Sequence, residues 1–169
     1  IGLCGVMPQR GLNKSMKKQL LIIATDPSAN TQRLRQAALT AAADPMFDAL
    51  EVTLKTPLET QAQDVLAADA VLFGTTENIG YMAGITKDLF DRCYFDWEGK
   101  TDGLSVALYI RAGSDGTGTR RALEAIFTGL NWRVVQPVLT LQGDWDDGFE
   151  DAVQELAQSL AAGLDAGIY

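Results

Sequence analysis

The sequence predicts an α/β fold in which a parallel sheet lies between two layers of helices, and three observations support this prediction. Short apolar runs that suit strands alternate with longer segments of helical periodicity along nearly the whole chain. Residues 20–24 and 70–73 are almost continuously apolar, as expected of strands buried on both faces. The chain has 169 residues, of which 47% are hydrophobic, which suits one domain with a substantial core.

The first three strand–helix units run from residue 20 to residue 94. The first helix is rich in Ala and Leu and stops at Asp44-Pro45, because the residue before a proline disfavours helical conformation. The second helix begins at Thr56-Pro57, since proline suits the first helical position. The third helix has apolar residues at helical spacing. The predicted bounds are strands 20–24, 49–54 and 69–74, and helices 31–43, 56–68 and 83–94.

The last two units complete the alternation. An apolar stripe at helical spacing marks the fourth helix, and the strands on either side of it are again largely apolar. Asp147 is predicted to cap the closing helix, with Glu150 completing the spacing of a capping box. The predicted bounds are strands 104–111 and 132–141, and helices 117–130 and 147–164.

Composition excludes several classes of function. A net charge of −8 argues against nucleic-acid binding, and no apolar run approaches the roughly 18 residues of a membrane span. The absence of histidine removes Ser–His–Asp and Cys–His catalysis as well as His-based zinc sites. Two cysteines without a CxxC motif predict neither a disulfide framework nor a thiolate metal site, so we expect no metal and a cytoplasmic location.

The first fifteen residues differ in composition from the rest of the chain. They show no clear period, whereas Met16-Lys17-Lys18 leads directly into the first apolar run. We therefore expect residues 1–15 to be an added or upstream leader, and residues 16–169 to be a single domain. A secretory signal is disfavoured because the leader has no long apolar stretch.

Three unusual loops are predicted to meet at one edge of the sheet. Sheets of this kind commonly have the strand order 2-1-3-4-5, and ligands lie beyond the carboxyl ends of strands 1 and 3. Residues 25–31 place hydroxyls and backbone N–H groups at a helix start, where an anion binds well. Residues 74–84 and 112–118 are rich in glycine, which lets backbone approach a ligand closely. Neither GxGxxG nor GxxxxGK is present in the first loop.

Two of these segments resemble the flavodoxin-like FMN-binding superfamily, most closely its NAD(P)H-dependent FMN reductase and quinone reductase branch. The resemblance rests on Ser28-Ala29-Asn30-Thr31 and on the segment 74–92, with its Lys87 and Asp91-Arg92. It implies a flavodoxin-like three-layer sandwich with a five-stranded parallel sheet. It also implies a site in which the phosphate of FMN is held by Thr25, Ser28, Ala29, Asn30 and Thr31. The isoalloxazine ring would then lie along Thr76, Glu77, Asn78, Ile79, Gly80 and Tyr81, with Ala112, Gly113 and Ser114 at its other edge.

The sequence departs from the pattern of this branch at three positions. Thr76 stands where proline is usual and Asn78 where tyrosine is usual, so Tyr81 or Trp97 would have to stack on the ring. Asp26 lies inside the phosphate loop, where a carboxylate repels a phosphate. We expect Asp26 to turn away and to bind its own backbone before Pro27.

Other residues admit a structural and a functional interpretation. Lys87 and Asp91 have the spacing of an intrahelical ion pair, which we favour over contact with flavin or nicotinamide. The aromatic residues 94, 95 and 97 suit core or subunit packing better than a flavin pocket. Cys93 suits a small buried apolar position. Arg120 and Arg121 suit a solvated helix face, with contact to the 2′-phosphate of NADPH as the alternative.

The resemblance implies an FMN-dependent oxidoreductase that takes electrons from NAD(P)H and passes them to a quinone or similar small acceptor. Because the flavin carries such chemistry, we assign no catalytic side chain. Relatives often form homodimers or homotetramers. A flavodoxin-type electron carrier is the first alternative, since acidic charge favours docking to basic partners. A flavodoxin-fold protein that has lost FMN is the second.

Overall fold

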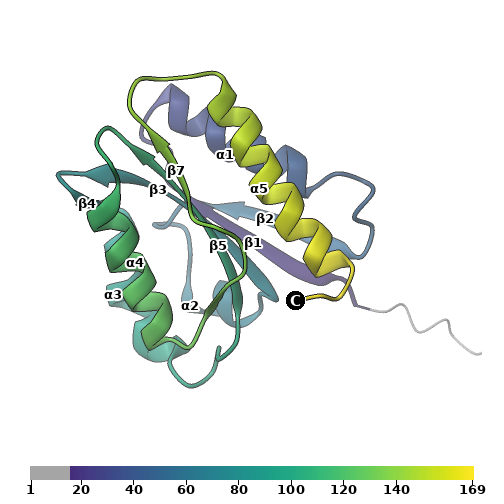
Figure 1. Cartoon of the computed structure of the whole chain (residues 1–169). Coiled ribbons are helices and arrows are strands. Elements are labelled where there is room, and N and C mark those ends of the chain that lie inside the picture. Colours follow the sequence, from purple (N-terminus) through teal and green to yellow (C-terminus); the bar gives the residue numbers. More distant parts are fainter. Residues whose placement is uncertain (1–15) are drawn as a thin grey trace, which may run out of the picture.

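The computed structural model describes residues 16–169 and confirms the flavodoxin-like α/β sandwich (Figure 1). The predictions for residues 1–15 lie outside the described part of the chain. The elements in chain order are β1 (Lys18–Ala24), α1 (Ala29–Ala42), β2 (Leu50–Lys55), α2 (Ala62–Leu66), β3 (Ala70–Asn78), β4 (Tyr81–Met82), α3 (Gly84–Trp97), β5 (Ser105–Ala112), α4 (Thr117–Gly129), β6 (Arg133–Val134), β7 (Leu139–Gln142) and α5 (Gly148–Asp165).

The strand order of the sheet agrees with the prediction. The central path is β2-β1-β3-β5-β6, with β4 paired to β3 and β7 paired to β5. All pairs are parallel except β3–β4, which is antiparallel. Because β5 is the fourth predicted strand, and β6 and β7 together replace the fifth, this is the predicted order 2-1-3-4-5. The carboxyl ends of β1, β3 and β5 therefore lie next to one another.

Alternate residues of the central strands enter two separate cores. On β1, Leu20 and Ile22 pack with the helices α1 and α5, while Leu21 and Ile23 pack on the side of α3 and α4. Figure 1 shows these two helical layers on opposite faces of the sheet. The four side chains are at most 4% exposed, which explains why this strand is a continuous apolar run.

Two predicted elements are shorter in the structure, because a turn replaces the start of one helix and a proline interrupts one strand. The helix predicted over residues 56–68 contains only the five residues of α2. Residues 56–60 form a turn instead, in which Thr60 N donates to Thr56 O at 3.1 Å. The last predicted strand divides into β6 and β7 around Pro137, which has no N–H to donate to a neighbouring strand.

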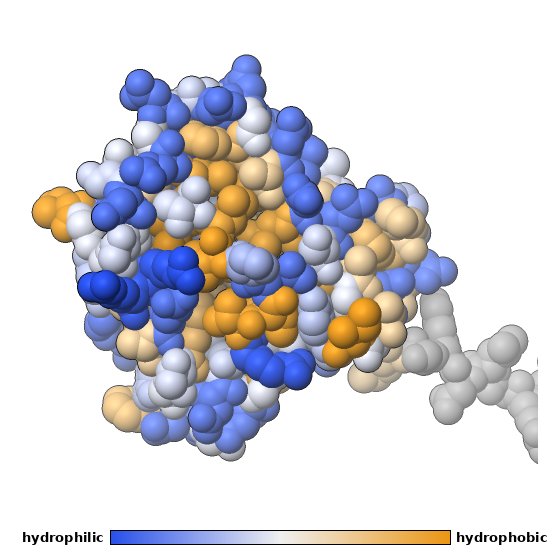
Figure 2. All heavy atoms as spheres, in the orientation of Figure 1, coloured by the Kyte–Doolittle hydropathy of each residue, from blue (hydrophilic) through white to orange (hydrophobic). Residues whose placement is uncertain are grey.

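The divided strand leaves apolar side chains at the edge of the sheet. Figure 2 shows them gathered between the two helical layers. Val134 is 39% exposed there, and Val135, Val138 and Leu139 are partly buried. Within residues 16–169, no helix combines the length and apolar character that crossing a bilayer requires.

Candidate functional site

The three predicted loops meet at the carboxyl end of the sheet. Thr25 N donates to Gly74 O at 3.0 Å, which joins the end of β1 to β3. Glu77, near the end of β3, accepts hydrogen bonds from the loop between β5 and α4. In Figure 1 the β3–β4 hairpin extends beyond the sheet at this end. The fold therefore assembles one site from segments that are far apart in sequence.

The first of these segments is the start of α1, where Ser28 is the N-cap residue. Its hydroxyl accepts from Thr31 N at 3.2 Å, and Ser28 N donates to the Thr31 hydroxyl at 2.9 Å. Each side chain thus accepts a hydrogen bond from the backbone N–H of the other residue, which is a capping box. The N–H groups of Ala29 and Asn30 have no hydrogen-bond partner within residues 16–169. These two donors, at the positive end of a 14-residue helix, are suited to an anion.

Contrary to the prediction, the side chain of Asp26 does not bind its own backbone. Its carboxylate instead pairs with Arg35, with Nη1 2.8 Å from Oδ2. Arg35 lies on α1, and its side chain is only 16% exposed. A guanidinium from the following helix therefore offsets the negative charge in the loop. Arg35 lies nine residues after Asp26, and no local sequence pattern links the two.

The second segment, residues 74–84, is mostly strand rather than loop. β3 continues to Asn78 and turns back into β4 through Ile79 and Gly80, whose φ values are +53° and +72°. Positive φ at both turn positions is typical of a tight type I′ hairpin. The Thr76 hydroxyl donates to the Asn78 side chain at 2.8 Å. Ile79 is fully exposed at the tip of the hairpin.

The third segment, residues 112–118, is joined directly to this hairpin. The two carboxylate oxygens of Glu77 accept from Ser114 N at 3.0 Å and Gly116 N at 2.8 Å. Ala112 is buried, whereas Gly113 and Ser114 are exposed. The structure therefore brings all the predicted site residues to one end of the sheet, but the N–H of Ser114 already has a partner.

Of the two aromatic residues considered for ring stacking, only Tyr81 lies at this end of the molecule. It is 41% exposed on β4. Trp97 is fully buried and donates its indole N–H to Ala62 O at 3.0 Å. It is the last residue of α3, about 20 Å along the helix from the end nearest the hairpin. The suggestion that Trp97 could stack on a ring is therefore wrong.

Several charged residues on α3 have structural partners. Lys87 pairs with Asp91, and this hydrogen bond raises the pKa of Lys87. Arg92 pairs with Asp88 and donates to the carbonyl of Pro57 at 2.8 Å, which holds the turn before α2. Cys93 is buried, as predicted, and burial raises the pKa of its thiol.

A further group of residues braces the β7–α5 loop at the same end of the sheet. Arg111 of β5 donates to Leu141 O at 3.0 Å and to Gly143 O at 2.6 Å. Arg33 of α1 lies over the ring of Trp145 and pairs with Asp147 at 3.2 Å. The predicted capping box at Asp147 is absent, because that carboxylate makes no cap hydrogen bond. The sequence pattern gave no sign of these contacts.

The side chains at this end of the sheet suit binding rather than acid–base catalysis. The chain has no histidine, and residues 16–169 contain no group of three or more side chains that could hold a metal ion. The Asp115 carboxylate accepts hydrogen bonds from Thr117, and these lower the pKa of Asp115 and keep it ionised.

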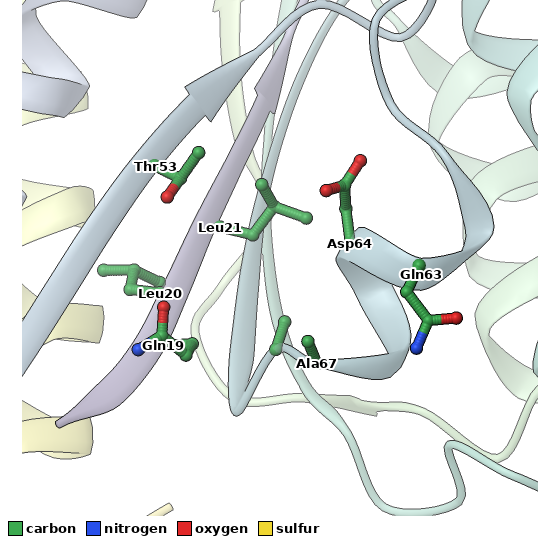
Figure 3. A pocket seen from close by; sticks show the side chains of 8 residues that line it. Gln19, Leu20, Leu21, Thr53, Gln63, Asp64 and Ala67 are labelled. Carbon is green, nitrogen blue, oxygen red and sulfur yellow. The ribbon is translucent and has the colours of Figure 1, made fainter. Parts of the chain in front are cut away.

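A separate cavity of about 240 Å³ lies between β1, β2 and α2. Figure 3 shows Leu21 of β1 and Asp64 of α2 facing each other across it. Gln19 also lines this cavity, near the amino end of β1. Since the predicted loops follow the carboxyl ends of the strands, the cavity is not part of the candidate site.

Known proteins resemble this chain in sequence and in fold. Residues 1–147 match the model of the family described as NADPH-dependent FMN reductase. A flavodoxin from Aquifex aeolicus (strain VF5) is 30% identical over 112 residues, which are 66% of this chain. The match spans 60% of the length of that flavodoxin.

Solved structures with the same fold include flavodoxins at low sequence identity, which supports the fold alone. A flavodoxin from the domain Archaea has a TM-score of 0.73 at 14% identity, over 86% of this chain and 98% of that one. Flavodoxin 1 from Bacillus cereus has a TM-score of 0.69 at 14% identity, with the same coverage of 86% and 98%. A WrbA-like flavodoxin from Agrobacterium tumefaciens has a TM-score of 0.64 at 15% identity, over 89% and 98%.

The family match and the related flavodoxin support a flavin-binding oxidoreductase or flavodoxin-like function. The fold and the strand order agree with this assignment. This chain belongs to the NADPH-dependent FMN reductase family.

Proposed function

We propose that this protein binds FMN at the carboxyl end of its sheet and passes electrons from NAD(P)H to a quinone or similar small acceptor. The start of α1 is the observation that carries the proposal. It presents the N–H groups of Ala29 and Asn30, which no group in the described residues 16–169 accepts, beside a carboxylate that Arg35 neutralises. An anionic group fits such a place, because the helix dipole adds about half a positive charge.

The three segments have separate roles in this proposal. Thr25, Ser28 and Thr31 shape the phosphate loop, and the free N–H groups at the helix start bind the phosphate. The backbone of residues 76–81 lies along the isoalloxazine ring, and Tyr81 is the aromatic side chain within reach. Residues 112–114 border the opposite edge, where Ser114 offers its hydroxyl rather than its engaged N–H.

Bound FMN supplies the ability to accept and release electrons, so the protein has to bind, orient and shield the ring. This division of roles agrees with a chain that has no histidine. The family description, which names an NADPH-dependent reductase, supports the choice of electron donor.

A flavodoxin-type electron carrier is the second candidate. The Aquifex relative is a flavodoxin, and the net charge of −8 would favour docking to a basic redox partner. A protein of this fold without FMN is a third candidate, and the Asp26–Arg35 pair weighs against it by removing the main electrostatic objection to a phosphate.

Anaerobic mixing of the FMN-loaded protein with NADPH or NADH separates these candidates. Prompt bleaching of the flavin's visible absorbance is the result we expect of a reductase. A flavin that stays oxidised with both donors but accepts electrons from dithionite would identify a carrier.

Thermal unfolding tests flavin binding itself. FMN at 100 times its Kd should stabilise the protein by about 2.7 kcal/mol. A purified protein that is colourless and gains no thermal stability in excess FMN would refute both flavin-dependent candidates.

A further inference from the structure

The carboxylate of Glu77 connects two walls of the proposed site. Its Oε1 accepts from Ser114 N at 3.0 Å and its Oε2 accepts from Gly116 N at 2.8 Å. The donors are 37 and 39 residues away from Glu77 in the sequence. Hydrogen bonds to an ionised carboxylate are roughly twice as strong as those between neutral groups. One side chain therefore joins the β3–β4 hairpin to the β5–α4 loop.

The β5–α4 loop depends on this carboxylate for two of its N–H groups. Gly116 is the N-cap residue of α4, with φ of +68° and no side chain to accept a hydrogen bond. Asp115 satisfies Thr117 N at 3.0 Å, and no acidic residue lies in the first turn of α4. Glu77 accepts from Ser114 N and Gly116 N, and it places a negative charge where the helix dipole favours one.

A second contact holds the hairpin against the same helix start. A Cβ on Gly118 would lie 2.1 Å from Gly80 O, so the turn of the hairpin sits directly on the first turn of α4. The hairpin is thus held at two points, by the Glu77 carboxylate near the end of β3 and by backbone contact at its turn. Two points of attachment fix its angle to the β5–α4 loop as well as its distance.

We propose that Glu77 is a positioning residue that sets the spacing between the two walls of the flavin-ring site. This inference rests on the proposed binding of FMN. The Glu77 carboxylate acts through the backbone of residues 114–116 and does not need to touch the ring. Its loss widens the slot for the ring and leaves the phosphate loop at α1 unchanged.

Glu77→Ala, Glu77→Gln and the control Glu98→Gln test this role. Glu98 is an exposed glutamate at the C-terminal end of α3, so the control makes the same chemical change away from the site. Glu77→Gln keeps the size of the side chain and one acceptor oxygen, so we expect it to disturb folding less than Glu77→Ala does.

Hydrogen exchange of the flavin-free protein is the first measurement. We expect exchange at Ser114 N and Gly116 N to be about tenfold faster in Glu77→Ala, with a smaller change in Glu77→Gln and none in Glu98→Gln. Unchanged protection of both amides in the two Glu77 variants would overturn the inference, whatever the protein binds.

Binding of FMN and of riboflavin, which lacks the phosphate, is the second measurement. Glu77→Ala should weaken both ligands by the same factor, about tenfold, because the ring loses its fixed walls. A purely structural role would lower thermal stability without this equal loss. Wild-type affinity for both ligands in the Glu77 variants would overturn the inference alone, whereas a wild-type protein that binds neither ligand would overturn the proposed function as well.

Discussion

Replacing Arg35 by methionine tests whether the phosphate loop can accept an anion because its own carboxylate is neutralised. Arg35 Nη1 lies 2.8 Å from Asp26 Oδ2, and the two side chains are 16% and 39% exposed. The substitution keeps an unbranched apolar stem on α1 and removes the charge. It leaves Asp26 unpaired, three residues before the first helical residue of α1.

The ion-pair geometry sets the expected magnitude. Unit charges about 4 Å apart attract by about 1 kcal/mol in water and by about 4 kcal/mol at an effective dielectric constant near 20. Asp26 is more than a third exposed, so solvent screening favours the lower figure, and we expect about 1 kcal/mol. Unpaired Asp26 would repel a phosphate at a similar distance by about the same free energy, which corresponds to roughly fivefold in Kd for FMN.

Isothermal titration of FMN and riboflavin into three variants measures this effect. Arg35→Met should weaken FMN about fivefold and leave riboflavin unchanged, because riboflavin carries no phosphate. Asp26→Asn should tighten FMN by less than about tenfold, and the double variant should return close to wild type. The differences should shrink in 1 M salt, where the Debye length is about 3 Å.

Two outcomes would refute this reasoning. If Arg35→Met bound FMN as tightly as the wild type, the ion pair would be irrelevant to the loop. If Asp26→Asn tightened FMN by more than about tenfold, the carboxylate would face the phosphate despite its pairing with Arg35.

Two further predictions concern stability. Gly118→Ala should lower the free energy of unfolding by about 1–3 kcal/mol, since its Cβ meets the backbone of the hairpin turn. Urea unfolding measures this loss. The control is Gly84→Ala, which lies in the first turn of α3 with open space around it. Equal stabilities of the Gly118→Ala and Gly84→Ala variants would contradict the predicted clash. Burial acts to raise the pKa of Asp64, but hydrogen bonds from Gln61 N and Lys55 lower that pKa overall. The ionised carboxylate therefore contributes its full stabilisation of the folded protein above the unfolded pKa near 3.9. This contribution is lost as pH falls through the lower folded pKa. Asp64→Asn should therefore flatten the fall of unfolding free energy below about pH 4, and the same slope as the wild type would contradict this.

The local pattern of the sequence was sufficient for the central strands and for the start of the first helix. Continuous apolar runs at residues 20–24 and 70–73 indicated strands buried on both faces, and the structure places helices over both. The position of Ser28 before a helical segment likewise indicated the N-cap of α1. These features depend on residues within a few positions of one another, which a linear reading captures.

Local sequence pattern did not predict the conformation of residues 74–84, which were expected to form a loop. Its three glycines suggested open backbone, but the chain forms a hairpin whose turn includes Ile79 at positive φ. A β-branched residue is disfavoured in that conformation, so its identity gave no indication of the turn. Contact of the turn with Gly118 on α4 holds it in place.

Local sequence patterns were enough to predict the strands, the helices and hence the fold class, and the common topology of such sheets then predicted the strand order and the edge where the three segments meet. The side chains that act at this edge became evident only in the folded protein, where Arg35 neutralises Asp26 and Glu77 joins two walls, whereas Trp97 is buried in the core. The physical reason is the range of the interactions. Periodicity and capping act over one or two turns of chain, whereas partners such as Glu77 and Ser114 come within hydrogen-bonding distance only after the sheet has assembled.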